Sequence, residues 1–274
     1  MKVVLFCGGL GTRLGEYSET IPKPMVNRGY RPIMWHLMRY YAHYGHKEFI
    51  LCLGYKGDYI KKYFLEYDES LSNDFVYKNG GNEIQLLNKD IADWKISFVD
   101  TGLNANLGQR LMAVREYLEG DEMFMANYSD GLSDLNLDFY LEQFQQQGKV
   151  ASFLCVRPSQ SFHLVDFGED GNVSGLSPVD KSNVWINGGF FIFKKDIFNY
   201  MKPGEELVQE PFQRLIAENK VAGYKNPGFW ACIDTMKEKK LFDDMYASGR
   251  TPWMVWKQAQ VRNERSVSHP SKSG

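Results

Sequence analysis

The chain begins with a short apolar run that leads into a glycine-rich segment, Val3-Val4-Leu5-Phe6-Cys7-Gly8-Gly9-Leu10-Gly11-Thr12-Arg13-Leu14. Ten residues after Arg13, Lys23 stands between Pro22 and Pro24. The apolar run has the length of a buried strand, and glycines let successive backbone N–H groups approach an anion closely. Arg13 offers a planar fork for phosphate oxygens, and Lys23 offers a compact charge on a backbone stiffened by proline. The segment therefore predicts a loop that binds the triphosphate of a nucleotide.

Two better-known phosphate motifs do not fit this segment. A P-loop requires a second glycine five residues after the first, and counted from Gly8 that position is Arg13. A dinucleotide-binding fingerprint that begins at Gly9 would need a glycine or alanine where Leu14 stands. Taken alone, the glycines also fit an ordinary turn between a strand and a helix. Arg13 and the Pro-Lys-Pro segment favour the phosphate-binding interpretation.

Length, charge and cysteine content narrow the class of protein. A chain of 274 residues can bury a substantial core, and a net charge of -2 with a pI near 6.2 gives no general attraction to nucleic acid or to anionic membranes. No apolar run approaches the ~20 residues of a membrane span, and no signal peptide precedes the first strand. The four cysteines lack metal-binding or redox spacing and indicate reduced thiols in a cytoplasmic protein: Cys7, Cys52, Cys155 and Cys232.

Strand-like and helix-like segments alternate through the first half of the chain. Strands are predicted over 3–6, 48–53, 95–99 and 122–127, and helices over 32–44, 58–67 and 109–118. This alternation predicts a Rossmann-like α/β fold, with a mostly parallel sheet flanked by helices. Further predicted elements are inserted β-hairpins at 73–87 and 162–176, a strand at 187–193, and helices at 211–218 and 237–247. We expect one domain over 1–257 and a mobile polar tail over 258–274.

Two aspartates follow apolar runs in the manner of ligand-binding residues. Ligands of parallel sheets bind outside the carboxyl ends of the strands, so Gly8-Gly9 and Asp130-Gly131 are expected to lie close together. Asp234 also follows an apolar run. Two carboxylates from distant positions, together with triphosphate oxygens, are a common way to hold Mg²⁺. Capping of the next helix is the alternative role for each aspartate alone.

Five motifs of this chain occur together in one family. They are Gly-Gly-Leu-Gly-Thr-Arg-Leu at 8–14, Pro-Lys-Pro-Met at 22–25, Ser-Asp-Gly at 129–131, Asn-Gly-Gly-Phe-Phe at 187–191 and Gly-Phe-Trp-x-x-x-Asp-Thr at 228–235. In this combination the chain resembles the sugar-1-phosphate nucleotidyltransferases, and most of all the glucose-1-phosphate cytidylyltransferases. The resemblance extends from Met1 to about Trp256, nearly the whole predicted domain.

The resemblance implies a homo-oligomeric enzyme that transfers CMP from CTP to a sugar 1-phosphate, such as glucose 1-phosphate, and releases pyrophosphate. It implies Mg²⁺ bound by Asp130 and Asp234, and catalytic roles for Arg13, Lys23 and Asp130. The implied nucleotide-binding residues are Gly8, Gly9, Gly11, Thr12, Arg13, Lys23, Gly131 and Arg110, with Arg110 at the pyrimidine. The implied residues around the acceptor are Asn187, Gly188 and Glu210.

The chain departs from the family on the acceptor side. Family members usually carry Glu-Lys-Pro shortly before the Asn-Gly-Gly strand, whereas this chain has Ser177-Pro178-Val179-Asp180-Lys181. Lys181 and His163 are therefore candidate contacts for the acceptor phosphate. Three alternatives stay open: an unchanged sugar phosphate gripped by Lys181, a phosphorylated acceptor that is not a sugar, or a CTP-binding sensor without transferase activity. The intact nucleotide and metal residues argue against the sensor.

Overall fold

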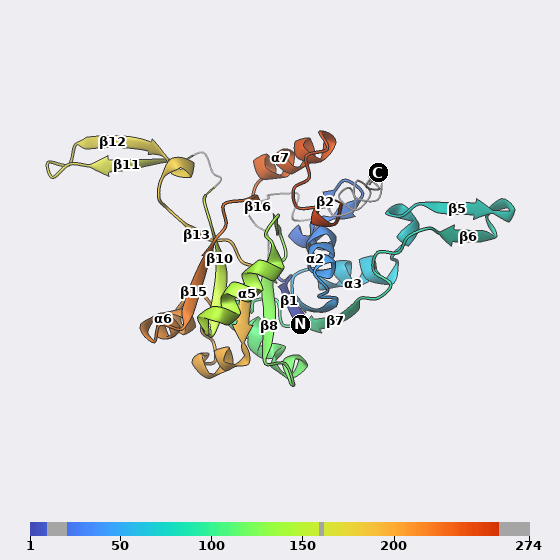
Figure 1. Ribbon diagram of the computed structural model, residues 1–274, viewed down its shortest axis with the longest axis horizontal. Coiled ribbons are helices and arrows are strands. Elements are labelled where there is room, and N and C mark those ends of the chain that lie inside the picture. Colours follow the sequence, from blue (N-terminus) through green and yellow to red (C-terminus); the bar gives the residue numbers. More distant parts are fainter. Residues whose placement is uncertain (10–20, 159–161, 258–274) are drawn as a thin grey trace, which may run out of the picture.

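The computed structural model describes residues 1–9, 21–158 and 162–257, and within them the chain forms a central sheet flanked by helices (Figure 1). The strand order is β13-β10-β14-β8-β1-β4-β7, with β15 beside β10. These strands are β1 (Lys2–Phe6), β4 (Glu48–Leu53), β7 (Lys95–Asp100), β8 (Met123–Tyr128), β10 (Ala151–Val156), β13 (Ile186–Asn187), β14 (Phe191–Lys194) and β15 (Val221–Lys225). The order brings together strands that are far apart in the sequence, as the predicted α/β fold requires.

The sheet is parallel through its centre and mixed on one side. β1 pairs in parallel with both β4 and β8, β4 pairs in parallel with β7, and β10 pairs in parallel with β15. β14 runs antiparallel to β8 and to β10, and β13 runs antiparallel to β10. The prediction of a mostly parallel sheet is thereby confirmed. The carboxyl ends of β1, β8, β10 and β15 all lie at one edge of the sheet.

The predicted strand over 187–193 is interrupted. Gly189 and Phe190 both have positive φ angles, 77° and 49°, and separate β13 from β14. The side chain of Asn127 causes this break, because its Oδ1 accepts a hydrogen bond of 2.9 Å from the Phe190 N–H. A Cβ atom at Gly189 would lie 2.3 Å from the same oxygen. Only a glycine fits at this close approach of a side chain to the backbone.

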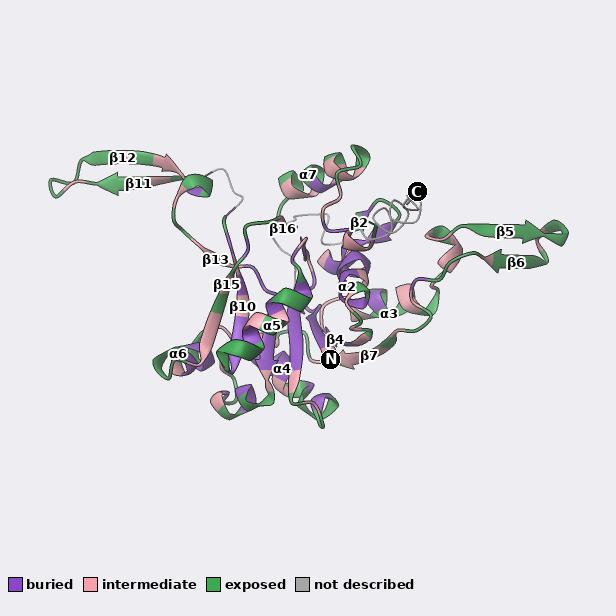
Figure 2. Ribbon diagram, in the orientation of Figure 1, coloured by how far each residue is buried: buried purple, intermediate pink, exposed green. Residues whose placement is uncertain are grey.

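Alternating side chains of the sheet enter two hydrophobic cores. Val3 and Leu5 belong to one core and Val4 and Phe6 to the other, because successive side chains of a strand point to opposite faces. The flanking helices are α2 (Ile33–His43), α3 (Gly57–Leu65), α4 (Leu107–Ala113), α5 (Leu137–Gln147), α6 (Glu210–Ala217) and α7 (Met236–Ala247). Figure 2 shows the buried strands between these layers. The predicted helix over 109–118 is shorter, because α4 ends at Ala113 and a 3₁₀ turn follows.

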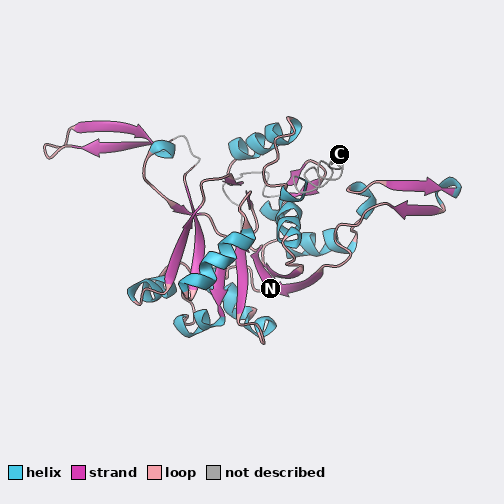
Figure 3. Cartoon of the chain, viewed as in Figure 1, coloured by secondary structure: helices cyan, strands magenta, loops and turns pink. Residues whose placement is uncertain are grey.

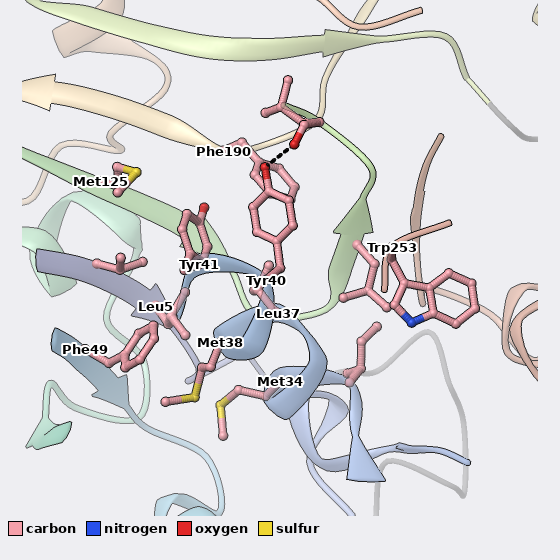
Figure 4. Close-up of a cluster of buried hydrophobic side chains, with 14 of the residues drawn as sticks. Leu5, Met34, Leu37, Met38, Tyr40, Tyr41, Phe49, Met125, Phe190 and Trp253 are labelled. Atoms are coloured by element: carbon pink, nitrogen blue, oxygen red, sulfur yellow. Dashed lines mark hydrogen bonds between the residues drawn. The ribbon is translucent and has the colours of Figure 1, made fainter. Parts of the chain in front are cut away.

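Helix α2 packs against the first of these cores (Figure 4). Two successive tyrosines of this helix are fully buried and still have polar partners. The Tyr40 hydroxyl donates to the carbonyl of Leu135 at 2.7 Å, and the Tyr41 hydroxyl accepts from Asn127 Nδ2 at 3.2 Å. Both rings contact Phe190. Helix α2 thus packs against the break between β13 and β14 and fixes its position.

Two β-hairpins extend from the body in opposite directions (Figure 1), and Figure 3 shows them as strand pairs on either side. One is β5 (Phe75–Lys78) with β6 (Glu83–Leu86), and the other is β11 (His163–Phe167) with β12 (Val173–Pro178). They confirm the two predicted hairpins, although β12 continues to Pro178.

Three further findings bear on the sequence predictions. All four cysteines are free thiols, as expected. A search of the described helices finds none with the length and apolar character needed to span a membrane. The predicted tail over 258–274 lies outside the described residues.

Candidate active site

A short antiparallel ladder brings the two predicted metal-binding aspartates together. Strand β9 (Gly131–Ser133) pairs with β16 (Trp230–Cys232), so that Gly131 lies opposite Cys232. The Ile233 N–H then donates to the Asp130 carbonyl at 3.0 Å. Asp130 and Asp234, separated by about a hundred residues in the sequence, therefore flank the same end of one ladder. The sequence predicted both residues, and the ladder explains how they meet.

Lys23 lies between these two carboxylates. Its Nζ is 2.6 Å from Asp234 Oδ1 and 3.6 Å from Asp130 Oδ2. The backbone is fixed by a 3₁₀ turn over Lys23–Met25, in which the Met25 N–H donates to the Pro22 carbonyl at 2.8 Å. The Lys23 side chain is only 14% exposed. The Pro-Lys-Pro segment thus presents an ammonium group with little conformational freedom to lose.

Lys23 and the two aspartates shift one another's pKa values. Burial lowers the pKa of Lys23, but the attraction of Asp130 and the hydrogen bond to Asp234 outweigh it, so the Lys23 pKa is raised. Burial also raises the pKa of Asp130; Lys23 opposes this change and Asp234 adds to it. Two carboxylates at one place attract cations, as the position of Lys23 between them shows.

The donor set suits Mg²⁺, a hard cation that prefers oxygen ligands and retains several waters. Among the described residues no group of three or more His, Cys, Asp and Glu side chains could hold a metal by itself. Asp130 and Asp234 would supply two carboxylates, and phosphate and water oxygens would have to complete the coordination. This is the pattern of a metal that arrives with a nucleotide.

A cavity of about 280 Å³ opens beside these residues at the carboxyl edge of the sheet. Gly8 and Gly9 line it together with Asp130, which confirms the predicted proximity of the two strand ends. The full lining consists of Phe6, Cys7, Gly8, Gly9, Lys23, Pro24, Ala105, Asn106, Leu107, Arg110, Tyr128, Ser129, Asp130 and Glu206. The cavity therefore combines backbone from the glycine-rich segment with the lysine and one aspartate.

Arg110 reaches this cavity from α4, and its guanidinium is held by protein groups. Nη1 donates to the Leu53 carbonyl at 3.0 Å and to Thr101 Oγ1 at 2.7 Å. Nη2 donates to the carbonyls of Gly8 at 3.1 Å and Leu103 at 3.3 Å. The four acceptors lie at or just beyond the ends of β1, β4 and β7. Arg110 thereby joins three strand ends, a role that its sequence position did not reveal.

This arrangement explains two glycines. A Cβ atom at Gly8 would lie 2.1 Å from Arg110 Nη1, and one at Gly54 would lie 2.8 Å from it. Gly9, by contrast, has nothing within 4 Å of a Cβ atom. Gly8 and Gly54 therefore make room for the guanidinium, whereas Gly9 leaves open space at the cavity.

The predicted acceptor residues Asn187 and Gly188 lie next to the cavity. Asn187 Nδ2 donates to the Tyr128 hydroxyl at 3.2 Å, and Tyr128 lines the cavity. Trp230 Nε1 donates to the Gly188 carbonyl at 2.8 Å. A Cβ atom at Gly188 would lie 2.9 Å from a methyl carbon of Val156. The Asn-Gly-Gly motif thus allows tight packing of β13 beside the site.

The other predicted acceptor residues lie outside the cavity lining. Glu210 is the first residue of α6, and its Oε2 accepts from the N–H of Glu206, a lining residue, at 3.2 Å. His163 and Lys181 are exposed at the base of the β11–β12 hairpin, where the Val179 N–H donates to the Phe162 carbonyl at 2.9 Å. The structure brings these two side chains to one region but not to the nucleotide cavity. The predicted residues Gly11, Thr12 and Arg13 lie outside the described residues.

Sequence reasoning missed several residues of the site. Tyr128 stands at the end of a strand directly before Ser129-Asp130, which is a usable signal for a lining residue. Asn106 caps α4 with a capping box that it forms with Gln109, and the Asn-x-x-Gln spacing announces such a cap. Glu206 follows no recognisable pattern. Its position in the lining depends on the distant segment before α6.

A mixed sheet with a glycine-lined cavity at its carboxyl edge, a lysine and two carboxylates defines the class of α/β enzymes that bind nucleotides. The family model described as nucleotidyl transferase matches residues 2–238. The chain belongs to the nucleotidyl transferase family, and it is an enzyme of that family.

Curated relatives resemble the chain along nearly its whole length. A protein of Bacillus subtilis named "Probable glucose-1-phosphate cytidylyltransferase" is 38% identical over 258 residues, which cover 93% of this chain and 100% of the relative. The glucose-1-phosphate cytidylyltransferase of Salmonella typhimurium is 35% identical over the same share of both chains.

Solved structures resemble the fold at lower identity. UDP-glucose pyrophosphorylase, solved in complex with UDP-glucose, superimposes with a TM-score of 0.67 at 17% identity, covering 91% of this chain and 99% of that one. HddC from Yersinia pseudotuberculosis, complexed with GMP-PN, gives a TM-score of 0.62 at 21% identity, covering 89% and 99%. These similarities establish the fold.

Proposed function

We propose that this protein transfers CMP from CTP to a sugar 1-phosphate, with glucose 1-phosphate as the first candidate, and releases pyrophosphate. The observation that carries the proposal is the convergence of Asp130, Asp234 and Lys23 beside a glycine-lined cavity. The full-length similarity to proteins named glucose-1-phosphate cytidylyltransferase supports the choice of CTP and of the acceptor.

The reaction is a displacement at the α-phosphorus of CTP. An oxygen of the acceptor phosphate forms a new bond to this phosphorus, and the bond to the bridging oxygen of the β-phosphate breaks. Pyrophosphate leaves with the electron pair of that bond. The attacking phosphate is already ionised near neutral pH, so no general base is required. The protein's task is to position two polyanions and to offset their repulsion.

The nucleotide side of the site would carry out most of this task. Backbone N–H groups of Gly8, Gly9, Gly11 and Thr12, with the side chains of Arg13 and Lys23, would hold the phosphates. Gly131 would border the nucleotide at the strand end. Arg110 uses its four terminal N–H groups on the protein, and its Nε–H has no partner among the described residues. We assign this remaining donor to the carbonyl oxygen of the pyrimidine.

Asp130 and Asp234 would hold Mg²⁺ against the triphosphate. When bound, the ion would neutralise charge on the phosphates and act as a Lewis acid at the transferring group. The protein groups act around it. Lys23 keeps the two carboxylates oriented, and its own ammonium can shift to a phosphate oxygen when the nucleotide enters.

Asn187 and Gly188 would border the acceptor, since Asn187 reaches the cavity through the Tyr128 hydroxyl. Glu210 would position the acceptor side of the cavity by accepting the hydrogen bond from the Glu206 N–H. A CTP-binding sensor is the second candidate function. The incomplete match to the family on the acceptor side is what favours it.

The test is pyrophosphate release with CTP and Mg²⁺ against a panel of hexose 1-phosphates, phosphorylated amines and polyol phosphates. We expect turnover with a hexose 1-phosphate, and loss of it in Lys23→Ala. Turnover restricted to another phosphorylated acceptor would overturn the choice of acceptor. Binding of CTP without pyrophosphate release for any acceptor would overturn the enzyme and favour the sensor.

We also propose that the protein is a homo-oligomer in the cytoplasm. The hairpins expose large apolar side chains that a lone subunit would leave in water, with Tyr77 at 63% and Phe167 at 68% exposure. The free thiols fit a reducing compartment. Analytical ultracentrifugation should give a mass above 31.7 kDa, and Tyr77→Lys or Phe167→Lys should lower it. A monomer for the unmodified protein would contradict this proposal.

A further inference from the structure

Beyond Asn187, two cations lie over one tryptophan at the carboxyl edge of the sheet. The guanidinium carbon of Arg157 lies 4.5 Å from the centroid of the Trp185 ring, and Lys225 Nζ lies 5.1 Å from it. The three residues come from different segments: Arg157 follows β10, Trp185 precedes β13, and Lys225 ends β15. None of them was singled out by a sequence motif.

The strand register places the residues next to this cluster on one face of the sheet. Cys155 of β10 pairs with Asn187 on one side and with Lys225 on the other, so these three side chains share a face. Arg157 lies two residues after Cys155, and Trp185 lies two residues before Asn187. Because alternate side chains of an extended strand point to the same face, both lie on that face if the pairing of β10 with β13 continues. They would then lie about 7 Å beyond Asn187, at a rise of about 3.3 Å per residue.

Asn187, which pairs with Cys155 of β10, lies between the cluster and the cavity. Asn187 donates to the hydroxyl of Tyr128, and Tyr128 lines the cavity beside Asp130. Lys23 and the two aspartates lie on the nucleotide side of that cavity, whereas Arg157 and Lys225 lie on the opposite side of Asn187. A ligand that spans the edge from Asp130 past Asn187 would reach both cations.

Among the described residues, the charges of the cluster have no counterpart. Neither Arg157 nor Lys225 forms an ion pair or a hydrogen bond through its side chain within the described residues, and both are exposed. The indole holds the two groups near each other but supplies no full negative charge. Two cations collected on one ring repel each other, and an anion between them would relieve that repulsion.

We infer that Arg157 and Lys225, ordered over Trp185, bind the phosphate of the acceptor. The inference rests on the proposed function, and it deepens that function by naming the groups that receive the second substrate. A phosphate monoester dianion matches the site, because the guanidinium fork can take two of its oxygens and the ammonium a third. The nucleotide phosphates have Lys23 and the glycine-rich segment as partners. The two polyanions are then held by separate sets of cations.

The experiment compares the Michaelis constants of the two substrates. Arg157→Gln and Lys225→Gln should each raise the KM for the acceptor about tenfold, since a hydrogen bond to a charged group is lost. The KM for CTP should change less than about twofold, and Arg157→Lys should recover part of the loss. The matched control is Lys95→Gln, which removes a lysine that is 74% exposed at the opposite edge of the sheet. It should leave both constants unchanged.

The outcomes separate this inference from the proposed function. If the unmodified enzyme turns over and the two variants leave the acceptor KM unchanged, the inference fails and the function stands. If the unmodified protein releases no pyrophosphate with any acceptor, the proposed function fails. Calorimetric titration with inorganic phosphate then tests the inference independently of any enzymatic activity. Binding that is lost in the Arg157→Gln/Lys225→Gln double variant supports it, and absent or unchanged binding overturns it.

Discussion

The two sides of the carboxyl edge are built in different ways. On the nucleotide side Lys23, Asp130 and Asp234 satisfy one another, and Arg110 is held by four protein acceptors. On the acceptor side Arg157 and Lys225 are exposed, and the described residues provide neither with a counter-charge. These four residues of the nucleotide side are therefore held in place by protein groups before any ligand binds. The acceptor side leaves its charges for the ligand to satisfy.

This difference indicates which substrate the fold itself positions. A group that is held by protein partners loses little freedom when a ligand arrives, and it orients that ligand precisely. An exposed side chain must be ordered at the moment of binding, which reduces the affinity gained. Substitutions on the nucleotide side should therefore cost more activity than equivalent substitutions on the acceptor side.

The largest expected effect belongs to Lys23. Lys23→Ala removes the ammonium that lies 2.6 Å from Asp234 and 3.6 Å from Asp130, and with it a cation that would face the incoming phosphates. We expect kcat/KM for CTP to fall on the order of 10³-fold, as for other preorganised charges at a transition state. Steady-state pyrophosphate release measures this. A loss below tenfold would contradict the expectation that substitutions on the nucleotide side cost more activity than those on the acceptor side.

The second effect concerns the pH dependence of stability that His36 of helix α2 causes. His36 of α2 is fully buried, and burial is the main cause that lowers its pKa from 6.5 to about 4. The imidazole is neutral in the folded state, whereas the unfolded chain binds a proton below pH 6.5. The stability is therefore complete above pH 6.5 and is lost as the pH falls towards 4, by about 3 kcal/mol in all.

Chemical denaturation at several pH values between 4 and 7 measures this dependence. In His36→Gln the slope of the free energy of unfolding over this range should be smaller than in the unmodified protein. His46, whose pKa is also lowered to about 4 by burial, should leave part of the slope in place. Equal slopes for the variant and the unmodified protein would show that His36 titrates normally.

A matched pair of glycine substitutions tests the Arg110 arrangement. Gly8→Ala places a methyl group 2.1 Å from the guanidinium, whereas Gly9→Ala meets nothing within 4 Å. The guanidinium cannot easily move aside, because Arg110 is buried and bonded to the ends of three strands. We expect Gly8→Ala to lower the free energy of unfolding by about 2 kcal/mol and Gly9→Ala to change it little.

Thermal or denaturant unfolding distinguishes the two variants. Arg110→Met should remove most of the difference between them, since the clash depends on the guanidinium. Equal stability of Gly8→Ala and Gly9→Ala would show that Gly8 is needed only for ligand binding. The hydrogen bonds of Arg110 to the strand ends would then not contribute to stability.

The sequence was sufficient for features whose chemistry is contained in a few neighbouring residues. Pro-Lys-Pro and the two hairpins depend on local backbone preferences, and the alternation of strands and helices predicted the sheet. The break at Gly189 and Phe190 was not predictable, because the side chain that causes it, Asn127, belongs to another strand. Local patterns carry no information about such a partner.

The same limit applies to the site. Arg110 was assigned to the nucleotide through a resemblance, but its four acceptors come from segments that only the folded sheet brings together. Arg157 and Lys225 meet over Trp185 because β10 pairs with β13 on one side and with β15 on the other. Register is set by long-range pairing, so no local pattern announces this cluster.

The smallest expected effect is that of Lys181, the lysine that the sequence offered as a phosphate contact. It is exposed at the base of the β11–β12 hairpin and is not part of the cavity lining, whereas Arg157 and Lys225 lie over Trp185 at the sheet edge. An isolated exposed charge contributes little, so Lys181→Gln should raise the acceptor KM less than about threefold. The measurement is made beside Arg157→Gln, with the same acceptor and at saturating CTP. A larger effect for Lys181→Gln than for Arg157→Gln would indicate that the acceptor phosphate binds at the hairpin base. In that case His163→Gln should weaken acceptor binding as well.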